Sequence, residues 1–361
     1  MGPTLILLSM ALAGWLAGFA VLGRILLRHA AAPMPDQAQQ RVDTMALSLI
    51  IPARNEEKTL PRLLGSLAGQ SVRPREIIVV DDHSTDRTAE VAQEWGAKVL
   101  ASQPLPEGWR GKTWACRQGA GLAAGDMFLF LDADTWFEPQ GLQLLLASYV
   151  EGVLSVGPYH AVQRPYEQLS AFFNLVMAGG TGAFVLWGGQ PRGLFGQVLL
   201  VRREDYEKVH GHESVKGRIL ENFYLAERFR QAGIPMQCVI GRGLCALQMY
   251  PDGPQGMIAG WTKGFASGAA QTPWLIMVLI VVWMGGLLLG PFLLATGWLG
   301  CAIYLLFAAQ LYVLWHRIGA FYWYTALLFP IPLVFYFLVF AWAVLRSGKT
   351  VSWKGRKIHA D

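Results

Sequence analysis

Charged residues are scarce in this sequence, which excludes an ordinary soluble protein. Of 361 residues, 15% are charged and 53% are hydrophobic, and the mean hydropathy is +0.33. No charged residue occurs from Pro3 to Leu22, a run long enough to cross a hydrocarbon core of about 30 Å. Apolar character returns after Gln271 and persists to Leu345. The sequence therefore predicts a membrane protein with a segment of ordinary globular composition between its apolar ends.

Cysteine is scarce as well, and the four cysteines are scattered without metal-ligand spacing. We expect free thiols in a reducing compartment rather than a disulfide framework or a zinc site. The formal net charge of +5 fits a protein that lies against anionic lipid, and nothing in the sequence suggests nucleic acid as a partner.

Basic residues are missing before the first apolar run, whereas Arg24 and Arg28 follow it. A removed signal peptide has the opposite arrangement, so we expect a retained anchor over residues 1–30, followed by a polar linker over residues 31–45. By the positive-inside bias, the basic flank places the globular part in the cytoplasm.

The apolar segment over residues 273–345 divides into about three pieces, near 273–293, 297–315 and 320–345. Three full spans would put the basic tail of residues 346–361 outside, against the positive-inside bias. One piece is therefore expected to be re-entrant or interfacial, and two prolines in the last piece, Pro330 and Pro332, make it the candidate. The tail is then cytoplasmic.

Strands and helices are expected to alternate from residue 46 onwards. Apolar runs predict strands over residues 47–51, 76–80, 98–101 and 127–131, and each is followed by a segment with helical periodicity. This order predicts an α/β fold with a mostly parallel sheet and helices on both faces. Ligands of such sheets bind at the carboxyl ends of the strands.

The most informative strand end is that of residues 127–131, where the apolar run stops at Asp132 and Asp134. In extended backbone, side chains two positions apart point to the same side, so these carboxylates can share one ion. Hard oxygen ligands suit Mg²⁺ or Mn²⁺, which usually take further ligands from water and substrate phosphates. An isolated Asp-x-Asp is more often a solvated turn, so its surroundings must decide.

Two neighbouring strand ends are also polar, at residues 52–57 and 81–84. Gly111 and Lys112 begin a predicted helix, where free backbone N–H groups and the helix dipole favour an anion. Each cluster alone could be a solvated loop or a surface lysine. Together, at one edge of the sheet, they predict a ligand site.

The motifs IIPARNEE, VVDDHSTD, GWRGK, LDAD and LENFYLAERFRQAG resemble, in this order, those of the family-2 glycosyltransferases. These are membrane-associated inverting enzymes with a nucleotide-sugar-binding GT-A fold. The resemblance implies a cytoplasmic GT-A domain over residues 46–250, with Asp132 and Asp134 as metal ligands. It implies that a UDP-sugar contacts Pro52, Ala53, Arg54, Glu56, Asp81, Asp82, Lys112 and Asp132. His83 departs from the pattern, because the family usually has glycine there.

The last motif also departs from the family, which usually has Glu-Asp at the head of this helix with the Asp as general base. This chain has Glu221-Asn222, and asparagine cannot accept a proton at neutral pH. Either Glu221 is the base, or the acceptor needs none, because a carboxylic acid is already ionised whereas a hydroxyl must lose its proton. Glu221 and Asp134 are the candidate catalytic residues.

Residues 154–176, 211–226, 249–269 and 351–356 look like the diaponeurosporenoate glycosyltransferases of bacterial carotenoid synthesis. That resemblance implies transfer of glucose from UDP-glucose to the carboxylate of a long carotenoid acid, at the inner membrane of a bacterium. A carboxylate nucleophile would explain Asn222. The alternatives are a hydroxyl or phosphate lipid as acceptor, such as diacylglycerol, ceramide or polyprenyl phosphate, and a nucleotide-sugar-binding scaffold without activity.

An apolar stretch over residues 169–189 is expected to be interfacial, because a span there would separate Asp134 from Glu221 across the bilayer. Phe172, Phe173, Phe184 and Trp187 are the candidates for acceptor contact, with core packing as the alternative. Residues 251–272 are expected to form an amphipathic helix at the membrane surface. It places Trp261 and Lys263 near the acceptor, although a lipid-facing lysine is the alternative.

Overall fold

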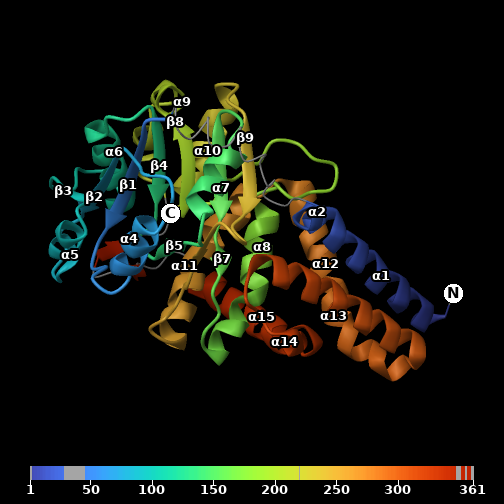
Figure 1. Cartoon of the computed structure of the whole chain (residues 1–361). Coiled ribbons are helices and arrows are strands. Elements are labelled where there is room, and N and C mark those ends of the chain that lie inside the picture. The colour runs from blue at the N-terminus through green and yellow to red at the C-terminus, as the bar shows by residue number, and fades with distance from the viewer. Residues whose placement is uncertain (1, 28–44, 219, 347–350, 354–355, 359–361) are drawn as a thin grey trace.

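The structure is a computed structural model that describes residues 2–27, 45–218, 220–346, 351–353 and 356–358. A sheet of seven strands carries helices on both faces, and long apolar helices lie side by side beyond one end of it (Figure 1). The α/β fold predicted from the alternation of strands and helices is confirmed.

Four parallel strands form one half of the sheet, in the order β3-β2-β1-β4. They are β1 (Leu47–Ala53), β2 (Glu76–Asp81), β3 (Lys98–Ala101) and β4 (Met127–Leu131). Ala53 pairs with Asp81, and Ile50 pairs with Phe130, so β1, β2 and β4 end at the same edge. The polar residues that follow these strands therefore meet there.

The other half of the sheet continues from β4 in the order β8-β6-β9. These strands are β8 (Val198–Arg202), β6 (Val153–Gly157) and β9 (Met236–Ile240). β8 runs antiparallel to both of its neighbours, whereas β9 is parallel to β6. The run VLLV is buried on both faces of the sheet, and such a run carries no signal of strand direction.

Alternate side chains of the central strands face different helix layers. Leu49 and Val79 pack with α4 (Leu60–Ala68), α5 (Thr88–Glu94) and α7 (Gly141–Ser148). Ile50 and Val80 belong to the other core, with α6 (Gly111–Leu122), α9 (Arg203–Lys208) and α10 (Glu221–Gln231). Both faces of the sheet are therefore covered.

A second sheet of three short strands lies beside the end of β4. Its order is β5 (Thr135–Phe137), β10 (Cys245–Leu247), β7 (Tyr159–His160), with β5 antiparallel and β7 parallel to β10. Leu247 pairs with Thr135, the residue after Asp134. This pairing brings residues about 110 positions later in the chain to the polar edge.

Among the described residues, three helices are long and apolar enough to cross a membrane. They are α1 (Pro3–Leu22), α12 (Trp274–Leu293), extended to Thr296 by the 3-10 helix η3 (Leu294–Thr296), and α13 (Trp298–Ile318). α1 packs against α12 so closely that a Cβ at Gly14 would lie 2.7 Å from the Cα of Gly286. Gln310 joins all three helices, accepting a hydrogen bond from Trp283 Nε1 at 3.1 Å and donating one to the Trp15 carbonyl at 2.8 Å.

The last apolar piece is interrupted before Pro330, giving α14 (Trp323–Leu327) and α15 (Pro330–Arg346), which is shorter than the three candidate spans. α15 packs against α11 (Pro254–Gln271), α8 (Ala171–Gly180) and the 3-10 helix η1 (Pro165–Ser170), under the sheet (Figure 1). The remaining elements are α2 (Arg24–Leu27), η2 (Gly211–Val215), β11 (Val351–Trp353) and β12 (Arg356–Ile358).

Candidate functional site

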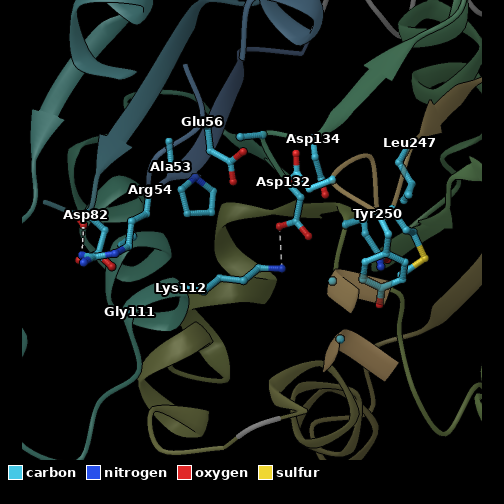
Figure 2. A pocket seen from close by; sticks show the side chains of 18 of the residues that line it. Ala53, Arg54, Glu56, Asp82, Gly111, Lys112, Asp132, Asp134, Leu247 and Tyr250 are labelled. Carbon is cyan, nitrogen blue, oxygen red and sulfur yellow. Dashed lines mark hydrogen bonds and ion pairs between the residues drawn. The ribbon is translucent and has the colours of Figure 1, made fainter. Parts of the chain in front are cut away.

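A pocket of about 570 Å³ lies at the edge where β1, β2 and β4 end (Figure 2). Its lining includes all but one of the residues that the sequence predicted for a nucleotide sugar, together with Asp134: Pro52, Ala53, Arg54, Glu56, Asp82, Lys112, Asp132 and Asp134. The exception is Asp81, whose Oδ1 accepts a hydrogen bond from the Ser84 backbone N–H at 3.3 Å.

The ends of β1 and β2 are tied together at the pocket. The Asp82 N–H donates to the Ala53 carbonyl at 2.8 Å, and Arg54 Nη1 donates to the Asp82 carbonyl at 2.6 Å (Figure 2). The guanidinium is thus held over the pocket edge, where a planar cation can stack on an aromatic base.

Left-handed backbone shapes the two turns after these strands. Asn55 and His83 both have φ of 55°. Asn55 Oδ1 accepts the Thr85 N–H at 2.8 Å, and the Asn55 N–H donates to Ser84 Oγ at 3.0 Å, so the turns brace each other. The conformation explains the expected glycine at position 83, because glycine adopts positive φ without strain.

Lys112 lies in the first turn of α6 and faces two carboxylates. Its Nζ is 2.6 Å from Asp132 Oδ1 and 3.7 Å from Glu221 Oε1, and it donates to the Gly196 carbonyl at 3.1 Å (Figure 2). Burial alone would lower the pKa of Lys112, but the attraction of Asp132 and Glu221 outweighs it and holds the pKa above its usual range. A permanent positive charge therefore stands at this pocket wall.

The backbone after Asp132 turns, which corrects the expectation of an extended Asp-x-Asp. Ala133 and Asp134 form a turn, and the Thr135 N–H donates to the Asp132 carbonyl at 3.1 Å. Both carboxylates still line the pocket. Among the described residues, no group of three His, Cys, Asp or Glu side chains could hold a metal. The donor set fits a hard divalent ion that is completed by water and phosphate oxygens.

Glu221 begins α10 behind Lys112 and is 9% exposed. Its Oε1 accepts a hydrogen bond from Asn222 Nδ2 at 3.2 Å, so the carboxylate is held by Asn222 and Lys112. Glu221 does not line the pocket. The Asn222 amide packs onto Gly196, where a Cβ would lie 1.8 Å from Nδ2.

The opposite wall of the pocket is mainly apolar, and the motifs assign no role to it. Figure 2 shows Leu247 and Tyr250 facing the charged side chains across the pocket. This wall comes from β10, the following loop and α11: Leu247, Met249, Tyr250, Asp252, Gly256, Ala259 and Gly260. Gln197, which precedes β8, also lines the pocket. Two signals in the sequence pointed to this wall: the helix expected over residues 251–272, and the similarity of residues 249–269 to the carotenoid-acid enzymes.

The aromatic side chains predicted to contact the acceptor do not line this pocket. Phe172 packs edge-to-face on Trp315 at 5.1 Å between ring centroids, and Phe184 lies 6.2 Å from Phe195. Both rings are fully buried, which favours the core-packing alternative. Trp187 is 56% exposed and lies outside the pocket.

Phe173 and Trp261 stack on each other, with centroids 4.7 Å apart, and both are buried. Trp261 Nε1 donates to Ser170 Oγ at 3.2 Å, which joins α11 to η1. Trp261 thus supports the helix that forms the apolar wall. The side chain of Lys263 lies outside the described part of the structure.

Comparisons with known proteins show which family the chain is similar to. The model of "Glycosyl transferase family 2" matches residues 48–208. A 4,4'-diaponeurosporenoate glycosyltransferase of Staphylococcus haemolyticus is 42% identical over 260 residues, 70% of this chain and 69% of the relative. One of Staphylococcus aureus (strain USA300) is 35% identical over 330 residues, 86% of this chain and 88% of the relative.

A solved structure of similar fold is the mannosyltransferase PcManGT from Pyrobaculum calidifontis, in complex with GDP-Man and Mn²⁺. It has a TM-score of 0.52 at 18% identity, and the match covers 93% of this chain and 99% of that one. At this identity the likeness shows the GT-A fold.

Proposed function

The chain belongs to glycosyl transferase family 2, and on this basis we propose that it transfers glucose from UDP-glucose, with inversion, to the carboxylate of a long carotenoid acid. The observation that carries the proposal is a single pocket with two chemically different walls. One wall presents Lys112, Asp132 and Asp134, and the other is mainly apolar. Such a pocket suits the meeting of an anionic donor with an apolar acceptor.

The charged wall holds the donor. Arg54 and the neighbouring strand ends receive the nucleoside, and Lys112 and the first turn of α6 contact the diphosphate. Asp132 and Asp134 would hold Mg²⁺ or Mn²⁺, which supplies charge neutralisation for the departing diphosphate when it is bound. We assign Asp81 a supporting role in the turn rather than a donor contact.

The acceptor carboxylate attacks the anomeric carbon on the face opposite the diphosphate. A carbon–oxygen ester bond forms, the bond to the diphosphate breaks, and its electron pair leaves with UDP. No proton has to be removed, because the acid is ionised before it attacks. Asn222 is compatible with this chemistry, and Glu221 acts by positioning Lys112 rather than as a base.

The membrane arrangement keeps both walls on one side. With α1, α12 and α13 as spans, residues after Ile318 return to the side of the catalytic domain. The Ala320 N–H donates to the His160 carbonyl at 2.9 Å, which supports this arrangement. We propose the cytoplasmic side of a bacterial inner membrane, with α14 and α15 in the interface and a basic cytoplasmic tail. We propose the same domain boundaries that the sequence predicted.

A phosphate lipid such as polyprenyl phosphate is the second candidate acceptor, because it too needs no base beside Asn222. The test uses the full chain in lipid nanodiscs with labelled UDP-glucose and Mn²⁺. Carotenoid acid, the corresponding alcohol, diacylglycerol and polyprenyl phosphate are offered separately. We expect an alkali-labile hexose ester of the acid, lost in Lys112→Met. A labelled glycerolipid or polyprenyl phosphate in place of the ester would overturn the proposal, as would the absence of any UDP release.

A further inference from the structure

Two small cavities, each of about 20 Å³, adjoin the main pocket. The first, here the Gln197 cavity, shares Gln197 and Leu247 with the main pocket. The second, the Tyr250 cavity, shares Met249 and Tyr250 with it. On the same measure, about 10–15 Å³ holds one water molecule, so each cavity has room for one water.

Asn174 of α8 lines both cavities and is 3% exposed. Neither its Nδ2 nor its Oδ1 has a hydrogen-bond partner among the described residues, and the same holds for the buried Oε1 of Gln197. Almost all buried polar groups in proteins have a partner, because an unpaired buried amide destabilises the fold. These amide atoms therefore point to a polar ligand in the cavities.

Charge and size decide what that ligand is. No lysine or arginine lines either cavity in the described chain, and Glu167 lines the Tyr250 cavity, so an anion would be buried without a cation. His160 lines both cavities, and burial lowers its pKa to about 4, which leaves the ring neutral. A neutral imidazole can donate and accept at once. Water satisfies amides and imidazole alike, whereas an apolar chain would leave them unpaired.

Gln197 lies where the two walls of the main pocket meet. Its carbonyl accepts the Asp132 N–H at 2.9 Å, which fixes its backbone beside the metal-binding carboxylate. Gln197 lines both the main pocket and the Gln197 cavity together with Leu247 of the apolar wall. A carboxylate that approaches the donor sugar along the apolar wall would pass this position.

We propose that water in the Gln197 cavity bridges Asn174 to the Gln197 amide oxygen, that water in the Tyr250 cavity pairs the other amide atom of Asn174, and that Gln197, so oriented, donates its N–H groups to the acceptor carboxylate. Asn174 is a positioning residue, and Gln197 binds the acceptor. The assignment of the carboxylate rests on the function proposed above, whereas the water site does not.

Asn174→Leu tests the water site with little change of volume, in the full-length protein in nanodiscs. The control is Met177→Leu, an apolar change on the same helix at a residue that lines the Gln197 cavity. If water pairs the amide, Asn174→Leu should leave Tm unchanged or lower it. It should also raise KM for the acceptor about fivefold, the worth of one hydrogen bond, with KM for UDP-glucose unchanged. Asn174→Ser, which still bonds water, should restore most of the affinity.

If the cavities hold no water, Asn174→Leu should have the opposite effect on Tm. Removing an unpaired amide would then raise Tm by about 2–8 °C without changing kinetics, and that result would overturn the proposal.

A double-mutant cycle separates positioning from packing. Gln197→Met should raise acceptor KM at least as much as Asn174→Leu, and the double variant should match Gln197→Met alone. Additive effects would refute the coupling. Wild-type protein that forms no ester would instead refute the proposed function, and the Tm comparison would still decide whether the cavities hold water.

Discussion

The two walls of the pocket are built in different ways. The charged wall consists of residues at and just after the ends of β1, β2 and β4, together with the first turn of α6. The apolar wall depends on the pairing of β10 with β5 and on the packing of α11 against α15 and η1. The first is encoded locally by strand ends, whereas the second exists only after distant segments have met. Substitutions in the charged wall should therefore affect binding of the donor, and substitutions in the apolar wall should affect binding of the acceptor.

Asp134→Asn should have the largest effect, because an uncharged amide oxygen is a weaker ligand of a hard divalent cation than a carboxylate. We expect transfer to fall about 10³-fold, as for the loss of a main electrostatic contact to the leaving group. Steady-state assays over a range of Mn²⁺ concentrations should show that the transfer rate of the variant responds less to the metal than the transfer rate of the wild type. Chelation of the metal should likewise abolish transfer by the wild type.

Asp252→Asn is the matched control, since Asp252 also lines the pocket but belongs to the opposite wall. It should retain most of the activity. Equal losses of activity in the two variants would show that the two walls do not have different roles.

Gly256→Leu should impair binding of the acceptor but not binding of the donor. A Cβ at Gly256 meets no atom within 4 Å, so the position opens onto free space at the apolar wall. A leucine would fill that space, and we expect KM for the acceptor to rise about tenfold with KM for UDP-glucose unchanged. Gly256→Ala is the control and should be active. A selective rise in donor KM would show that this wall serves the nucleotide sugar instead.

Glu221→Gln should have a smaller effect, which depends on the acceptor. The carboxylate is held by Lys112 and Asn222, so with an ionised acid its loss should weaken the position of Lys112 but remove no base that the reaction needs. Parallel assays should show a loss below about tenfold with a carboxylic acid. An alcohol would need Glu221 as a general base, which is worth about 10²–10⁴-fold, so the loss with an alcohol should be larger. A loss of about 10²-fold or more with the acid itself would contradict the base-free mechanism.

The accuracy of the sequence predictions differs between the walls for the same reason. Apolar runs that stop at polar residues revealed the ends of β1, β2 and β4, since both signals lie in neighbouring residues. The turn at Ala133 and the direction of β8 depend on partners elsewhere in the fold. The sequence could not decide between core packing and acceptor contact for Phe172, because phenylalanine is typical of both environments. Hydropathy found α1 but could not show that it packs on α12.

His83 provides the smallest expected effect and tests how locally the charged wall is built. It is exposed, with φ of 55°, a conformation that costs most residues about 1–2 kcal/mol relative to glycine. His83→Gly relieves this strain but gives the unfolded chain more freedom, so the free energy of unfolding should change by less than about 1 kcal/mol. His83→Val, which is β-branched, should lower the free energy of unfolding by about 1–2 kcal/mol.

Chemical denaturation of both variants measures the difference in stability, and we expect the less stable variant to have the higher KM for the donor. Equal stability of the two variants would mean that the contacts of Asn55 with Ser84 and Thr85, rather than residue 83, set the turn.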